Sequence, residues 1–206
     1  MRTSTIWFCI AVSMLITLSG CKGNNIDTDL MIEETCHPPC WNSIIPGETS
    51  EDQAIEILHQ LELENKGILK ISESNISWYS NDGKSYVIQV NKAVVQIRFE
   101  VKATSLEKLI EQFGQPNGFI VIPGRHNGFA LTLYYPQSGL AFLAQGSKSW
   151  GLSSKRAVTR DMPITYAYFV APSDIRGMLT VIHGVEWVDK LLPELKDWTG
   201  YGEVTP

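Results

Sequence analysis

The chain has 206 residues, of which 44% are hydrophobic, 19% are charged and 10% are aromatic. This composition is typical of a folded globular protein and argues against a wholly disordered chain. The formal net charge of -5 argues against a general nucleic-acid-binding protein, which would carry a basic surface. The length fits one domain, or two small units that share a core.

Residues 1–20 have the pattern of an export signal. Arg2 supplies a positive start, and the mostly apolar stretch from Ile6 to Leu18 is too short to span a bilayer comfortably. The stretch ends in the motif LSGC, whose cysteine is Cys21. The sequence therefore predicts that residues 1–20 lie outside the fold.

The LSGC motif resembles the lipobox of bacterial lipoproteins, in which the cysteine receives a diacylglycerol and the preceding peptide is removed. The resemblance implies a mature chain that begins at Cys21 and is anchored to a membrane by lipid, outside the cytoplasm, at the cell surface or on the periplasmic face. One acyl chain anchors a protein only marginally, whereas two anchor it stably. Residues 21–35 would then be a lipidated, flexible tether. The alternative is an ordinary secretory signal with a chance cysteine.

Two further cysteines, Cys36 and Cys40, lie where the predicted tether meets the folded body. Export would place them in an oxidising compartment, so we expect a disulfide between them. A metal- or copper-type redox site built from Cys36, His37 and Cys40 is the alternative, although a fourth ligand has no motif spacing. Free thiols are the third possibility. Haem attachment is excluded, because it needs a histidine after a Cys-x-x-Cys pair and His37 lies inside the pair.

The body contains two similar helix starts, at residues 49–58 and 104–113. Each begins with a threonine, Thr49 or Thr104, which we expect to cap the helix, and each has an acid three residues later. Apolar residues then recur at helical spacing, which predicts helices over 50–63 and 104–113. Two unrelated capped helices would give the same pattern.

After each predicted helix the hydrophobic period changes to two, which indicates β-strands. The predicted strands are 67–71, 76–79, 85–90 and 94–101 after the first helix, and 119–122, 130–135 and 140–144 after the second. A further strand is predicted at 164–170, a third helix at 173–182 and a last apolar segment at 185–195. The fold class is therefore α+β, with two related helix-plus-antiparallel-meander units forming one body: residues 36–103, and residues 104–206 with a C-terminal extension.

Three short motifs also resemble those of uncharacterised bacterial lipoproteins: PCW-x-x-I-x-PG-x-T at 39–49, FGQP at 113–116 and W-x-GYG at 198–202. The helix-start pattern is similar to that of envelope lipoproteins of the SmpA/OmlA type and of the tandem units in β-lactamase-inhibitor proteins. These relatives bind other proteins and catalyse nothing. The resemblance therefore implies a binding role.

The sequence predicts no catalytic residues, no cofactor and no resident metal, because no nucleophile elbow, phosphate loop or titratable cluster has the required spacing. We expect a membrane-anchored cell-envelope lipoprotein that is not an enzyme and that binds a protein or supports an assembly. The alternative function is metal or redox handling at Cys36, His37 and Cys40. Residues 22–103 carry 7 positive and 13 negative charges, which favours a cationic partner for the first unit unless the excess only reflects the acidic tether.

Overall fold

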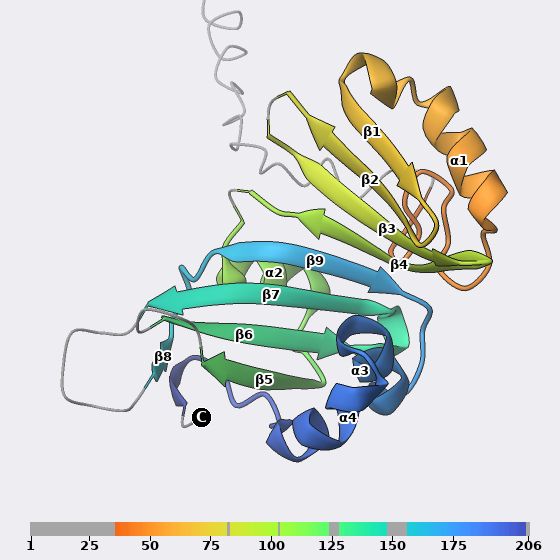
Figure 1. The fold of residues 1–206 in the computed structure, drawn as a ribbon. Coiled ribbons are helices and arrows are strands. Elements are labelled where there is room, and N and C mark those ends of the chain that lie inside the picture. Colours follow the sequence, from red (N-terminus) through yellow and green to blue (C-terminus); the bar gives the residue numbers. More distant parts are fainter. Residues whose placement is uncertain (1–35, 82, 103, 124–127, 148–155, 205–206) are drawn as a thin grey trace, which may run out of the picture.

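The computed structural model describes residues 36–204 except positions 82, 103, 124–127 and 148–155. The fold is α+β: helices pack on an eight-stranded antiparallel sheet in the order β1-β2-β3-β4-β9-β7-β6-β5 (Figure 1). Its strands are β1 (Gly67–Ser72), β2 (Asn75–Ser80), β3 (Ser85–Asn91), β4 (Ala93–Glu100), β5 (Gly118–Pro123), β6 (Gly128–Tyr135), β7 (Leu140–Ser147) and β9 (Ile164–Val170). A two-stranded sheet pairs β8 (Arg156–Val158) with β10 (Gly202–Val204).

The α-helices are α1 (Glu51–Gln60), α2 (Leu106–Phe113), α3 (Ile175–His183) and α4 (Val185–Leu191), with short 3-10 turns at Leu63–Asn65, Pro136–Ser138 and Leu192–Glu194. In the first half of the body, residues 36–102, α1 precedes the meander β1 to β4. In the second half, residues 104–204, α2 precedes β5, β6, β7 and β9. The halves join where β4 pairs with β9. The common ancestry of the two halves stays a prediction.

The helix caps correct the sequence prediction by one residue. Ser50, not Thr49, caps α1: its hydroxyl accepts from the Gln53 N–H at 3.3 Å, and the Gln53 side chain accepts from the Ser50 N–H at 3.0 Å. Ser105, not Thr104, caps α2: its hydroxyl accepts from the Lys108 N–H at 3.4 Å, without the reciprocal bond seen at α1. Both threonines are buried, and the Thr49 hydroxyl accepts from the Ile45 N–H at 2.8 Å, whereas the serines have the extended backbone typical of a cap.

One face of the sheet, which we call the covered face, carries the main core. In-register neighbours form a row of buried side chains from β2 to β5 that packs under α1 and α2. The row consists of Trp78, Tyr86, Phe99, Ala167, Phe142, Leu133 and Phe119. Because this row is continuous, the two halves share a single core.

The opposite face is treated differently in the two halves. In the second half, α3 and α4 pack over it, and Met178, Leu179 and Val188 bury against Tyr134 and Ala141. Figure 1 shows α2 behind this half of the sheet and α3 and α4 in front of it. The second half is therefore a three-layer structure. Its cover reaches as far as β4, which α3 contacts, whereas the cluster under α3 and α4 contains no described residue of β1 to β3.

The C-terminal segment packs on the body. Lys196 exchanges two backbone hydrogen bonds with Phe119 and so covers the outer edge of β5. The Trp198 ring lies edge-on to Phe119 and to Tyr201, with centroids 5.8 Å and 5.9 Å away. The Arg160 guanidinium lies 5.0 Å above the Tyr201 ring. These contacts tie the W-x-GYG motif to the second half.

Candidate functional site

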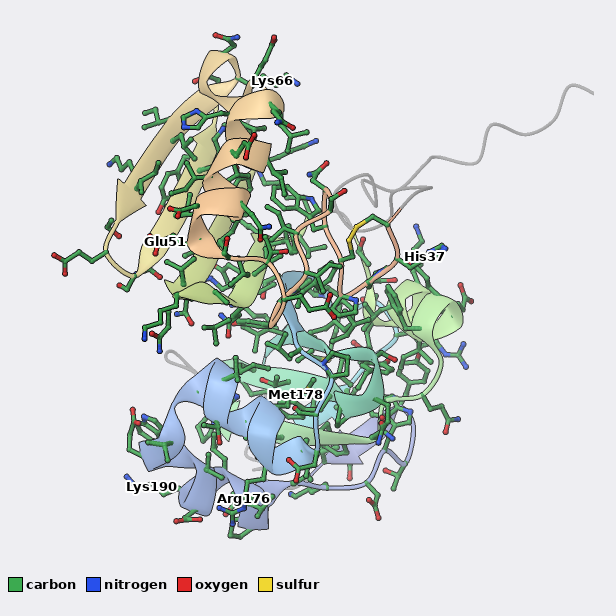
Figure 2. The ribbon with its side chains drawn as sticks, turned by 90° about the vertical axis from the view of Figure 1, so that its right-hand side faces the viewer. His37, Glu51, Lys66, Arg176, Met178 and Lys190 are labelled. Carbon is green, nitrogen blue, oxygen red and sulfur yellow. A yellow bond between two sulfur atoms is a disulfide. The ribbon has the colours of Figure 1, made fainter. Side chains whose placement is uncertain are left out.

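The segment before α1 carries the two described cysteines. Cys36 and Cys40 lie at disulfide distance, with their Cα atoms 5.4 Å apart, and Figure 2 shows the bond in yellow. Just after it, Trp41 is buried with its ring centroid 4.7 Å from that of Tyr86 and 5.3 Å from that of Phe99. The cysteine loop therefore holds a large side chain in the covered face, which is a packing role.

The alternative metal or redox site requires free thiolates at both cysteines, so it competes with the disulfide. His37, between them, is exposed and labelled in Figure 2. Among the residues that the structure describes, no three His, Cys, Asp or Glu side chains gather in a group that could hold a metal ion. The predicted lipid-attachment residue Cys21 and the tether at 21–35 lie outside the described residues.

The bare side of the first half is the candidate site that emerges from the structure, and we call it the open face. Two in-register rows of side chains cross β1, β2, β3, β4 and β9 on this side. One row is Ile68, Tyr79, Ser85, Glu100 and Tyr166, and the other is Lys70, Ser77, Val87, Arg98 and Tyr168. Ile68, on the edge strand β1, is 57% exposed, and its cross-strand neighbour Tyr79 on β2 is 47% exposed, so two large side chains with apolar surface lie together at this end of the face.

The open face is hollowed where β2, β3, β4 and β9 meet. This hollow of about 460 Å³ is lined by Tyr79, Val87, Arg98 and Tyr166, among others. The Arg98 guanidinium lies 5.5 Å above the Tyr166 ring, and the Ser85 hydroxyl donates to the Glu100 carboxylate at 3.0 Å. Tyrosine rings and an arginine held over one of them are side chains enriched at protein interfaces.

The negative charge of the first half does not lie on this face. Glu51, Asp52 and Glu56 belong to α1, which covers the other side of the sheet. The open face carries Lys70 and Arg98 against one described acid, Glu100. The charge count of the first unit averages over both sides of the sheet, and the cationic partner for that unit stays a prediction.

The strongly shifted titratable groups belong to the core and not to the open face. Burial raises the pKa of Tyr134 and of Tyr135 above the usual range of a phenol. The Tyr134 hydroxyl lies 2.9 Å from His183 Nε2, and burial lowers the pKa of His183 below its ordinary value. This pair joins α3 to the sheet, so its physical role is to hold the cover of the second half in place.

Sequence reasoning located the strands of the open face but did not identify it as a site. A local signal existed: Ile68 and Tyr79 interrupt the polar positions of two otherwise amphipathic strands. The position of α3 and α4 over the second half could not be predicted from the sequence. It depends on the pairing of β4 with β9, which are distant in the chain.

Comparisons with protein-family models, with curated proteins and with solved structures give no match. In the described part of the chain, no helix is both long and apolar enough to cross a membrane.

Proposed function

We propose that this protein is a membrane-anchored cell-envelope lipoprotein that binds another protein on the open face of β1 to β4. The proposal depends on one observation: the two halves of one continuous sheet differ in how far helices cover the same face. The same face is buried under α3 and α4 in the second half, whereas the cluster under these helices includes no described residue of β1 to β3, where Ile68 and Tyr79 are about half exposed.

The composition of the open face supports a protein as the ligand. An antiparallel sheet can keep one side in water, but such a side is normally polar along the strand. Here Ile68 and Tyr79 are in-register neighbours, and Val87 and Tyr166 are half-buried beside them. Ser85 and Arg98 lie further into the sheet, on β3 and β4, and tyrosine and arginine are residue types enriched at protein interfaces.

Site-specific photocrosslinking in intact cells tests the binding role. A photoreactive phenylalanine analogue in place of Tyr79 should yield one recurrent protein adduct. The same analogue in place of Gln60, which is exposed on α1, is the matched control and should not yield that adduct. Arg98→Glu combined with the Tyr79 probe should reduce the adduct. Identical adducts from both probe positions, or none from Tyr79, would contradict the proposal.

The lipid anchor is tested separately by membrane fractionation of the wild type and of Cys21→Ser. We expect the wild type in the membrane fraction and the variant outside it, because the variant cannot carry the diacylglycerol. If Cys21→Ser stays in the membrane as firmly as the wild type, the protein is not a lipoprotein of this kind.

A further inference from the structure

The two outer edge strands of the eight-stranded sheet, β5 and β1, differ in whether another backbone segment covers them. The edge of β5 is closed by the backbone of Lys196, which bonds to Phe119 in both directions. The edge of β1, at the other end of the sheet, has no such cover among the described residues. Proteins usually protect an exposed edge strand with charges, proline, a bulge or a covering segment, because its unpaired backbone groups can pair with another chain. Of these features, β1 has a single charge, the exposed Lys70.

The hydrogen-bond register shows which backbone groups of β1 point outward. The Asn81 N–H donates to the Lys66 carbonyl, so the even-numbered residues of β1 face β2 in hydrogen-bonded pairs. The N–H and C=O groups of the odd-numbered residues, including Leu69 and Ile71, consequently point away from the sheet. They form a short ladder of donors and acceptors ready for a ninth strand.

The side chains of β1 indicate what that strand would carry. Ile68 is 57% exposed on the open face and Ile71 is 48% exposed on the covered face, so a neighbour on either side would be apolar. Lys70 lies between them on the open face, opposite the uncharged Ser77, and no carboxylate pairs with it in the described part of the chain. A strand added at this edge would place one side chain directly beside Lys70, where a carboxylate is favoured.

The geometry points to β1 as a docking edge for an extended segment of a partner protein that alternates apolar residues with an acidic residue. The inference rests on the proposed function, since it says how part of the partner binds. Backbone pairing along β1 would supply affinity, while Ile68, Lys70 and Ile71 would select the side chains. The added strand would also extend the open face.

A designed peptide serves as the probe: fluorescently labelled Thr-Tyr-Val-Glu-Val-Tyr-Thr, whose symmetry permits either strand direction. Its binding to the full chain in detergent is measured by fluorescence anisotropy. We compare Ile71→Pro with Ile71→Ala. Both remove the exposed apolar side chain, but only proline removes the outward N–H, and proline is tolerated at an edge where that N–H is not used by the sheet.

We expect Ile71→Pro to bind the peptide about tenfold more weakly than Ile71→Ala, which corresponds to one lost hydrogen bond. Lys70→Glu should reverse the preference between the glutamate peptide and its lysine counterpart. Circular dichroism of each variant must match that of the wild type. If proline unfolds the chain, N-methylated peptides are tested on the wild type instead: methylation of alternate peptide residues should abolish binding in one phase and spare it in the other.

Equal affinities of Ile71→Pro and Ile71→Ala, or N-methylation without alternation, would overturn the inference. Dimerisation of the full chain that Ile71→Pro abolishes would overturn it as well, because the occupant would then be a second copy. The proposed function is tested by a separate result, the crosslinked adduct at Tyr79. If the crosslinked adduct at Tyr79 persists in Ile71→Pro, the open face binds its partner and only the added strand is wrong.

Discussion

The two halves of the body begin alike and end differently. Each starts with a serine-capped helix on the covered face and continues into four antiparallel strands. The second half then adds α3 and α4 over its other face, and its outer edge is closed by Lys196. The first half has neither, so its open face and the edge of β1 stay exposed in a chain that buries the same features elsewhere.

This difference separates the covered face, which the fold needs for its stability, from the open face, which stays available for binding. The covered face is one continuous core, so it needs both halves. The open face contributes little to that core, yet it presents Ile68, Tyr79 and Arg98 together. The predictions below test whether stability and binding divide between these two sides of the sheet.

The largest effect is expected at Trp41, which lies in the covered face against Tyr86 and Phe99. Trp41→Ala should lower the free energy of unfolding by about 3–5 kcal/mol, because it removes a buried ring and leaves a cavity. Trp187→Ala is the matched control: this ring is 48% exposed on α4, beneath Lys190. The control should lose about 1 kcal/mol or less. Chemical denaturation of both variants measures the difference, and equal losses would show that Trp41 does not seal the core.

A smaller loss in the free energy of unfolding is expected at the cysteine loop. Replacing Cys36 and Cys40 by serine should cost about 2 kcal/mol or less, because a loop of so few residues restricts the unfolded chain only modestly. Mass mapping without reduction should show the peptide that contains both cysteines lighter by two hydrogens. A stoichiometric metal ion that is lost in Cys36→Ser would support the metal or redox alternative instead.

The cover of the second half should respond to pH through His183. Burial lowers the pKa of His183 below its ordinary value of 6.5, so the unfolded chain binds the proton more tightly than the folded chain. The free energy of unfolding should therefore fall as the pH drops from about 6.5 towards the lowered pKa. His183→Gln should flatten this slope, as denaturation curves across that range will show. His59→Gln, on exposed α1, is the control, and an unchanged slope in His183→Gln would contradict the assignment.

Most elements were predictable because their signals are local. Ser50 and Ser105 lie next to the threonines that the sequence suggested as caps, and Gly114 follows α2 with a φ of 77°, a value that favours glycine. Hydrophobic runs separated by turn residues located the eight strands of the main sheet, although β5 and β6 are buried over most of their length and do not alternate. The first helix was predicted too long, because the apolar spacing continues through Leu61 into the 3-10 turn that follows.

The tertiary arrangement was not predictable in the same way. The pairing of β4 with β9 joins segments separated by α2 and the four strands β5 to β8, and no local pattern encodes it. The short strands β8 and β10 are too brief for a period to show. The candidate site depends on both kinds of information, since the side chains of the open face come from local alternation but their exposure comes from where α3 and α4 dock.

The smallest effect on stability is expected on the open face, from the double substitution Ile68→Thr and Tyr79→Thr. These side chains are cross-strand neighbours that remain about half exposed, so their mutual contact is worth about 1 kcal/mol or less. Threonine keeps the β-propensity of both positions, so the sheet should persist, and chemical denaturation should give a curve close to that of the wild type. The same variant should lose the protein adduct formed through a photoreactive group at Val87, because the apolar centre of the face has gone. A loss of several kcal/mol would place Ile68 and Tyr79 in the core and remove the distinction between the two sides of the first half.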